Sequence, residues 1–389
     1  MRNTGFIFFI LSTFLYFTSC SVNDSEAEQL KTVVEWEWEI SSPEKEGVDP
    51  QILDSIHNDI LDGQYGLLDH MLLVRNGKII IDNHYDHDYQ TLSQQYDTTN
   101  HQYNYDHPNW HPYYNRTNLH SLQSVTKSIT SILVGIAIDE GLLDIHDTTI
   151  MSLFSEYQLD FHDIIQAPIS VEDLLTMRSG IKWNEEDYAD SNNDCVKMEL
   201  STNWIEYILN SQMDTVPGTE FVYNGGNTVL LGKILAYVTG MRIDQWAEKK
   251  LFQPLGIVDY YWKKTPNGEI DTEGGLYLKP RDLAKIGLLM INEGQFANQQ
   301  ILSKEWVQKS IKPISQVTPE VTCGYVWWGL ETINEKVEVY AALGFGGQYL
   351  MIAPKYNMLI VFNNWNTHDP QEKYAWHVFQ NLILPNTEQ

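Results

Sequence analysis

The stretch SVTKSITSILVGIAIDEG, residues 124–141, predicts a long helix that is buried on nearly every side. Its apolar side chains include Ile129, Ile132 and Leu133, which recur with the spacing of an α-helix. The helix is apolar almost all round, which is typical of a buried helix and not of a surface one. Gly141 follows it as a common C-terminal residue. We therefore expect this helix in the interior of the protein.

The same stretch places a serine and a lysine three positions apart, at its beginning. On a helix such residues share one face, with Cβ atoms about 5–6 Å apart, so the Lys127 amine can reach the Ser124 hydroxyl. The helix N-terminus favours negative charge and is expected to depress the pKa of Lys127, which would let the neutral amine act as a base. The alternative is that Ser124 only caps the helix and that Lys127 is an ordinary surface residue.

The Ser-x-x-Lys pattern is weak by itself, because it occurs twice more, at residues 42–45 and 179–182. The first of these contains Pro43 in a loop. The second contains Gly180, which is expected to end a helix. Only the pattern at Ser124 therefore has the helical geometry that the contact requires.

The rest of the chain predicts a sheet built from both ends of the sequence with helices between them. Asp49 and Pro50 begin a helix that runs to Leu61, and Asn76-Gly77 is typical of a tight turn between strands at 70–75 and 78–81. Residues 82–120 show no period and are expected to be irregular. Further helices are expected at residues 171–178, 204–210, 227–238, 243–251, 280–292, 303–310 and 371–384, and strands at 326–330, 337–341, 348–353 and 358–363.

Composition limits the classes of function. The chain has 389 residues, 43% of them apolar, so it can bury a large core. Its formal net charge of −27 argues against a nucleic-acid partner, because phosphate binding needs a basic face. Of its three cysteines, Cys195 and Cys323 lie far from the N-terminus, and one disulfide between them is possible but not deducible from sequence.

The N-terminus predicts export. Residues 6–17 are apolar but too few to span a bilayer, which needs roughly 20, so residues 1–19 are expected to be a signal peptide. Thr18, Ser19 and Cys20 look like the lipobox of bacterial lipoproteins, in which the cysteine carries the lipid anchor. An ordinary signal with an incidental cysteine is the alternative. Residues 20–40 would then be a tether, and the protein would sit on a membrane of the bacterial cell envelope through its N-terminal lipid.

Four segments together resemble the serine β-lactamase and penicillin-binding protein superfamily, in particular its class C-like esterases, peptidases and amide hydrolases. They are LQSVTKS at 122–128, LLTMRSG at 174–180, PGTEFVYNGG at 217–226 and LLG at 230–232. The resemblance implies an α/β (α+β) fold of the β-lactamase/transpeptidase kind over residues 41–389. In that fold an antiparallel sheet flanked by helices, about 41–120 and 320–389, packs on a mostly helical lobe, about 121–319, with the active site between them.

The resemblance also implies a catalytic machinery. Ser124 would be the nucleophile, Lys127 its base and Tyr223 a second proton carrier, while the backbone N–H groups of Ser124 and Gln348 would form the oxyanion hole. The residues expected beside the substrate are Asn224, Gly225, Phe345, Gly346 and Gly347. Alternatives stay open, because Tyr223 could be a core residue and the segment at 344–348 a plain glycine-rich turn.

Two departures from the superfamily pattern bear on the substrate. Gly225 stands where the motif has an asparagine, and Phe345 stands where a basic residue would bind a substrate carboxylate. We therefore expect an exported, monomeric serine hydrolase that cleaves small-molecule or peptide-like esters or amides through an acyl-enzyme, without a cofactor. A β-lactamase or D-alanyl-D-alanine carboxypeptidase, and a non-catalytic envelope binding protein, are the alternatives.

Histidines crowd the segment before the nucleophile, at positions 84, 87, 101, 107, 111 and 120. His84 and His87 form a His-x-x-His pair, which raises the possibility of a metal site. The segment is equally rich in Tyr and Asn and has no regular period. We expect it to form a polar, aromatic wall over the substrate cleft, and we predict no metal.

Overall fold

The computed structural model describes residues 36–95, 111–154, 168–188, 190–331, 338–367 and 373–388. Residues Val34–Gln389 form one compact unit. The predicted signal peptide, Cys20, most of the tether, His101 and His107 lie outside the described residues. Among the described residues, no helix is long and apolar enough to cross a membrane.

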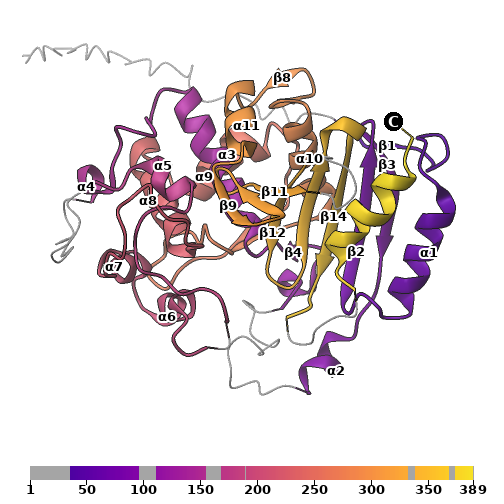
Figure 1. Ribbon diagram of the computed structural model, residues 1–389, viewed down its shortest axis with the longest axis horizontal. Coiled ribbons are helices and arrows are strands. Elements are labelled where there is room, and N and C mark those ends of the chain that lie inside the picture. The colour runs from indigo at the N-terminus through magenta and orange to yellow at the C-terminus, as the bar shows by residue number, and fades with distance from the viewer. Residues whose placement is uncertain are drawn as a thin grey trace, which may run out of the picture. The chain divides into compact units, whose positions relative to one another are not determined.

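A mixed sheet of nine described strands crosses this unit (Figure 1). In spatial order they are β1 (Glu39–Ile40), β3 (Lys78–His84), β2 (Leu68–Arg75), β14 (Met358–Asn364), β13 (Gln348–Ala353), β12 (Glu338–Gly344), β11 (Trp328–Glu331), β10 (Val321–Cys323) and β9 (Ser315–Thr318). The pairing of β2 with β14 joins the two ends of the chain, as the pattern of strands predicted. The predicted antiparallel sheet flanked by helices is confirmed, with one parallel pair added at its edge, where β1 runs parallel to β3.

Each face of the sheet covers a separate core. Along β14, Leu359 and Val361 belong to one cluster, whereas Met358 and Ile360 belong to the other, as the two-residue period of a strand requires. The second face is covered by α1 (Pro50–Leu61) and by the C-terminal turns α12 (Ala375–Val378) and η5 (Phe379–Ile383). The first face packs on α10 (Pro280–Ile291) and on α3 (Val125–Asp139), the helix predicted from residues 124–141.

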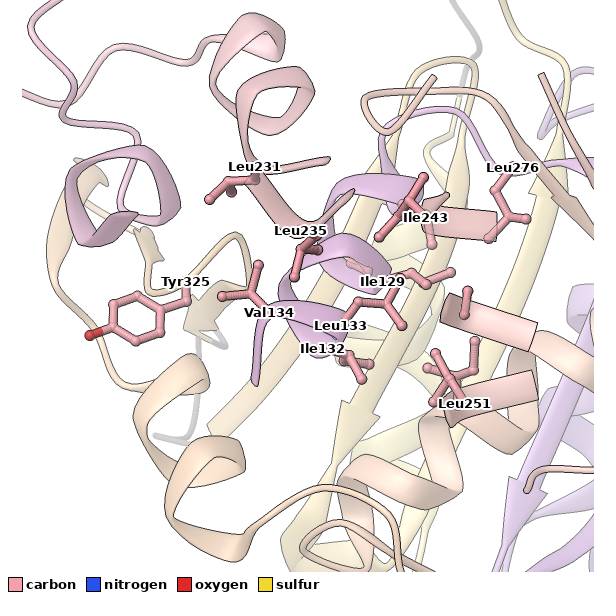
Figure 2. Packing of buried hydrophobic residues seen from close by; sticks show 14 of the residues in the cluster. Ile129, Ile132, Leu133, Val134, Leu231, Leu235, Ile243, Leu251, Leu276 and Tyr325 are labelled. Carbon is pink, nitrogen blue, oxygen red and sulfur yellow. The ribbon is translucent and has the colours of Figure 1, made fainter. Parts of the chain in front are cut away.

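Helix α3 is the centre of the first core, and every residue from Val125 to Ala137 is buried. Figure 2 shows its side chains beside those of α8 (Gly225–Thr239), and the same cluster includes side chains of the neighbouring helices and of the sheet. The packing is tight enough that a Cβ at Gly135 would lie 2.3 Å from the ring of Trp306 on α11 (Lys304–Ile311). Burying each Leu or Ile contributes roughly 1.5–3 kcal/mol, so this core holds α3 firmly in place.

Three further helices lie where they were predicted. They are α5 (Val171–Leu175), α7 (Trp204–Leu209) and α9 (Ile243–Ala247), which continues into a π-helical turn, η3 (Glu248–Phe252). Two more helices, α4 (Ile150–Leu153) and α6 (Asp194–Leu200), were not predicted. The expectation that residues 82–120 are irregular is partly wrong. Asp88 accepts a hydrogen bond from the backbone N–H of Thr91 and so caps α2 (Tyr89–Ser93). A short strand, β4 (His120–Ser121), then pairs with β6 (Leu276–Leu278).

Candidate active site

Ser124 stands at the start of α3 without acting as its cap. Its side chain makes no capping hydrogen bond and is partly exposed. The residue before it, Gln123, has a φ of 46°, a left-handed conformation that costs a non-glycine residue about 1 kcal/mol or more. The interpretation of Ser124 as a simple helix cap is therefore wrong. The strained turn at Gln123 leaves the Ser124 side chain partly exposed, next to the buried helix.

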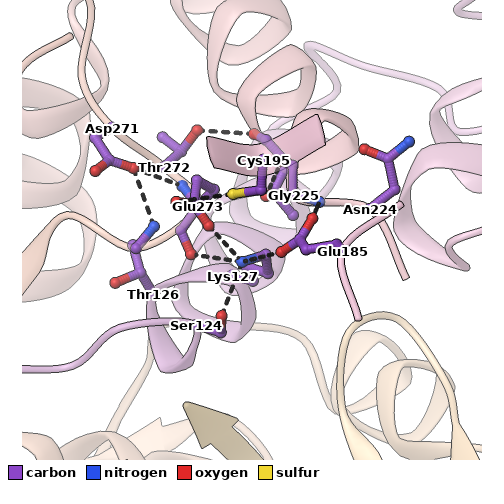
Figure 3. Close-up of polar contacts among 12 residues, drawn as sticks. Ser124, Thr126, Lys127, Glu185, Cys195, Asn224, Gly225, Asp271, Thr272 and Glu273 are labelled. Atoms are coloured by element: carbon purple, nitrogen blue, oxygen red, sulfur yellow. Dashed lines mark hydrogen bonds and ion pairs between the residues drawn. The ribbon is translucent and has the colours of Figure 1, made fainter. Parts of the chain in front are cut away.

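Lys127 is completely buried, with 0% of its surface exposed, and so is not an ordinary surface residue. Its Nζ donates to Ser124 Oγ at 2.9 Å, to the backbone carbonyl of Glu273 at 3.0 Å and to Glu273 Oε2 at 2.6 Å (Figure 3). These contacts use all three hydrogens of an ammonium group. The helical spacing thus brings the serine and the lysine together, and Glu273 completes the arrangement.

The charge state of Lys127 differs from the expectation. Burial by itself would lower the pKa of the amine, but the carboxylate of Glu273, aided by Tyr223 and Glu185, outweighs burial and raises the pKa well above its usual value. The predicted depression by the helix N-terminus is therefore wrong. In the resting site Lys127 is an ammonium paired with a carboxylate.

A second carboxylate, Glu185, lies beside this pair. Its oxygens accept hydrogen bonds from Trp183 Nε1 at 2.7 Å, from the backbone N–H of Gly225 at 2.6 Å and from the Tyr188 hydroxyl at 2.9 Å, and one oxygen is 4.0 Å from Lys127 Nζ. Burial raises the pKa of Glu185, although Lys127 opposes this shift. The site therefore holds two acidic groups against one amine.

Gly225 makes room for both acidic groups. A Cβ at this position would lie 3.1 Å from Glu185 Oε2 and 3.2 Å from Glu273 Oε2. The motif in the resembled superfamily has an asparagine here. In this chain the space beside Gly225 is taken by two carboxylates, one 2.6 Å and the other 4.0 Å from Lys127 Nζ.

Tyr223 is the third member of the group. Its ring centroid is 5.2 Å from Lys127 Nζ, and its side chain is partly exposed. Burial raises the pKa of Tyr223 to about 12, against the effects of Lys127 and of a hydrogen bond with Ser124. Contact with both Ser124 and Lys127 distinguishes Tyr223 from a tyrosine that only packs in the core.

The predicted oxyanion residues meet around Gly344. In the β12–β13 pair Gly344 lies opposite Gln348, and a Cβ on Gly344 would lie 3.2 Å from the backbone nitrogen of Ser124. A side chain at 344 would also collide with the carbonyl of Leu122, at 2.6 Å. Glycine is therefore required for this strand to lie against the turn that carries Ser124.

The residues that were predicted to contact the substrate differ in their burial and in their local structure. Asn224 is fully buried and caps α8 by accepting from the backbone N–H of Asn227, so it is not available to a substrate. Gly346 and Gly347 have φ values of 74° and 95° and form the turn between β12 and β13. Phe345 is half-buried, with its ring 4.9 Å from that of Tyr188, and faces the Glu185 side of the site.

Sequence reasoning missed Glu185, Glu273 and Cys195. Their ligand atoms lie within 4.8 Å of one another, and they form the only such group of His, Cys, Asp or Glu in the described part of the chain. The ammonium of Lys127 is the cation in contact with this group. Glu273 lies 146 residues after Lys127 in an unremarkable TEGG segment, so nothing in the local pattern pointed to it.

The described histidines of the segment at 82–120 lie elsewhere. His84, His87, His111 and His120 line a cavity of about 900 Å³. Its described lining contains none of the three residues predicted to be catalytic. The expectation that this segment forms a wall over the substrate cleft is therefore not supported by the described residues.

The chain is similar to several known proteins. A family model described as Beta-lactamase matches residues 71–379. A 6-aminohexanoate-dimer hydrolase from Paenarthrobacter ureafaciens is 28% identical over 68% of this chain and 70% of its own length. A lovastatin esterase from Penicillium rubens is 28% identical over 44% of this chain and 46% of its own length. The fold is similar to that of an octameric penicillin-binding protein homologue from Pyrococcus abyssi, with a TM-score of 0.62, 18% identity and coverage of 86% of this chain and 79% of that chain.

Asp271 is expected to make the stability of the folded protein depend on pH. Its Oδ1 accepts from the backbone N–H groups of Glu273 at 3.1 Å and Gly274 at 3.0 Å, and so holds the turn that carries Glu273. Burial, followed by the charge of Glu273, raises the pKa of Asp271 from 3.8 to about 7. Between these values the folded protein holds a proton that the unfolded chain has lost, so this group makes stability fall as the pH rises from about 4 to about 7.

We expect Asp271→Asn to remove this loss, because the amide oxygen still accepts both N–H groups but does not titrate. The free energy of unfolding, measured by urea denaturation from pH 4 to pH 8, should rise in the variant relative to the wild type across that interval and level off above pH 7. Parallel curves for the two proteins would contradict the assignment.

Proposed function

The chain belongs to the Beta-lactamase family, and from this premise we propose that it is a serine hydrolase that cleaves neutral esters or amides through an acyl-enzyme on Ser124. The observation that carries the proposal is the 2.9 Å hydrogen bond from the buried Lys127 Nζ to Ser124 Oγ. Curated relatives include an amide hydrolase and an esterase, which supports the same reaction class.

The first step needs Lys127 as a neutral amine with a free lone pair. Glu273 can produce this form of Lys127 by accepting one of its protons. One proton passes from Lys127 Nζ to Glu273 Oε2 over 2.6 Å, which converts the buried ion pair into a neutral pair. Substrate binding favours this transfer, because excluding water from the site penalises separated charges more than neutral groups. Lys127 can then take the hydroxyl proton of Ser124.

Attack follows from that proton transfer. Ser124 Oγ forms a bond to the carbonyl carbon, and the π electrons of the carbonyl move to its oxygen. The backbone N–H groups of Ser124 and Gln348 stabilise the oxyanion. The leaving group departs with its bonding electrons and takes a proton from Tyr223, which is replaced by the proton that Lys127 received from Ser124.

Deacylation reverses these roles. Water attacks the acyl carbon and gives a proton to the neutral amine of Lys127, either directly or through Tyr223, which takes the proton of water as it passes its own phenolic proton to the amine. Ser124 Oγ then leaves with a proton from the same pair. Glu273 finally returns its proton to Lys127. The resting ion pair is restored, and water has been consumed.

The charges of the site favour a neutral substrate. The motif position of the carboxylate-binding residue carries Phe345, and the one amine of the site is already paired with Glu273. Glu185 adds a second acidic group next to it. A substrate carboxylate would find no free cation among these groups, which disfavours β-lactams and D-alanyl-D-alanine ends.

We expect Ser124→Ala to abolish hydrolysis of p-nitrophenyl butyrate and labelling by a fluorophosphonate, because both require the nucleophile. Ser42→Ala is a matched control, since Ser42 begins another Ser-x-x-Lys pattern but lies in a loop. Its activity should equal that of the wild type. If the folded wild type shows neither hydrolysis nor labelling, a non-catalytic binding protein becomes the better account, and a fluorescent penicillin that labels Ser124 would favour the β-lactamase alternative.

Glu273→Gln tests the proton route. The amide cannot accept the proton of Lys127, so we expect kcat for the same ester to fall by about 10²- to 10⁴-fold with a small change in KM. Glu185→Gln should lose less, because Glu185 lies 4.0 Å from Nζ and has other donors. A rise in kcat at neutral pH in Glu273→Gln would mean instead that Glu273 only keeps Lys127 charged.

We also propose that the enzyme acts at the cell envelope, on the strength of the apolar segment at 6–17 and of Cys20. Expressed in a bacterial host, the full chain should fractionate with membranes and incorporate labelled palmitate, and Cys20→Ala should do neither. A Cys20→Ala variant that still carries the label would exclude the lipobox interpretation.

A further inference from the structure

Strained backbone that is not exposed gathers around the candidate active site. Ten described non-glycine residues have a positive φ, and seven of them are exposed. The other three are Gln123, Met177 and Val326. Gln123 precedes the proposed nucleophile, and the carbonyl of Met177 accepts a hydrogen bond at 2.9 Å from the backbone N–H of Val222, one position before Tyr223. Strain of this kind tends to collect at functional sites, which leaves the strain at Val326 to be explained.

Val326 is the most unusual of the three. Its φ is 59° and its side chain is 2% exposed. A β-branched residue with a positive φ is a genuine outlier, and such a conformation persists only where the surrounding structure holds it. Ser128 Oγ donates a hydrogen bond to the carbonyl of Val326 at 2.6 Å, and Ser128 is itself buried. The hold therefore comes from α3, the helix that also brings Lys127 to Ser124.

The strained turn leads directly into the strand that covers Tyr223. Val326 lies two positions before Trp328, the first residue of β11. The half-exposed ring of Trp328 is 5.8 Å from that of Tyr223 and 6.2 Å from that of Phe221. Trp328 therefore packs both on Tyr223 and on the segment that carries it.

We propose that Ser128 is a positioning residue for Tyr223. Its hydroxyl holds the carbonyl of Val326, the strained backbone there directs Trp328 onto the Tyr223 ring, and Trp328 keeps that ring beside Ser124. Without the hydroxyl, the carbonyl loses its buried donor and the backbone can relax to a φ that valine prefers. This role rests on the proposed hydrolase reaction, in which Tyr223 gives a proton to the leaving group.

The test compares two esters that share an acyl group and differ in their leaving group. p-Nitrophenolate is a weak base and leaves without a proton, whereas ethoxide needs one as it leaves. We expect Ser128→Ala to lower kcat/KM for ethyl butyrate at least about 10-fold more than for p-nitrophenyl butyrate, because a displacement of about 1 Å can cost about 10²-fold in rate. Tyr223→Phe should show the same pattern more strongly. A general loss of folded protein would lower both values equally.

Ser131→Ala is the matched control. Ser131 lies on the same helix and is also buried, but its hydroxyl has no hydrogen-bond partner among the described residues. The ratio of the two kcat/KM values should therefore stay at that of the wild type. Trp328→Leu is a second variant, which serves if Ser128→Ala does not fold. It removes the ring contact with Tyr223 from a half-exposed position and should shift the ratio in the same direction as Ser128→Ala. Circular dichroism checks that each variant is folded.

The outcomes separate this role from the reaction on which it rests. A folded Ser128→Ala or Trp328→Leu with the wild-type ratio overturns the proposal, and so does an equal shift in Ser131→Ala. A wild type that hydrolyses only the p-nitrophenyl ester also overturns it, since Tyr223 then protonates no leaving group, but leaves Ser124 as the nucleophile. A wild type that hydrolyses neither ester and takes no fluorophosphonate label overturns the proposed function, and this role with it.

Discussion

The ion pair between Lys127 and Glu273 is the contact on which the site depends. Both side chains are buried, and removing one partner of such a pair typically costs about 3–5 kcal/mol, because the other charge is left uncompensated. The pair therefore fixes the position of the amine, and through it the hydrogen bond to Ser124. It also keeps the amine charged in the resting site, so the proposed mechanism begins with a proton transfer within this pair.

The fold supplies the rigidity that this pair requires. Lys127 projects from a helix that is buried along its length, and Glu273 follows a turn that Asp271 holds through two backbone N–H groups. Strand β6 continues directly from that turn and pairs with β4, which leads into Ser124. Ser124 and Glu273 thus lie next to neighbouring strands of one small sheet.

The departures from the resembled motif are physically linked. The positions of Glu185 and Glu273 depend on the glycine at 225. A Cβ at this position would lie about 3 Å from both carboxylates. The two acidic groups raise the pKa of Lys127 and add negative charge to the site, in line with the proposed preference for neutral substrates. Phe345, whose ring is 4.9 Å from that of Tyr188 on the Glu185 side, fits the same proposed preference.

The sequence by itself determined the elements whose pattern is local. The buried helix at 124–140, the Asn76-Gly77 hairpin, the sheet formed from both chain ends and the contact of Ser124 with Lys127 all follow from residue periods or from residues a few positions apart. The tertiary structure decided the partners of Lys127 and the sign of its pKa shift. Glu185 and Glu273 lie 58 or more positions away, in segments without a pattern of their own, and only folding brings them to the amine. The parallel edge strand, the burial of Asn224 and the separate cavity that the histidines line were decided there for the same reason, since each depends on which distant segments pack together.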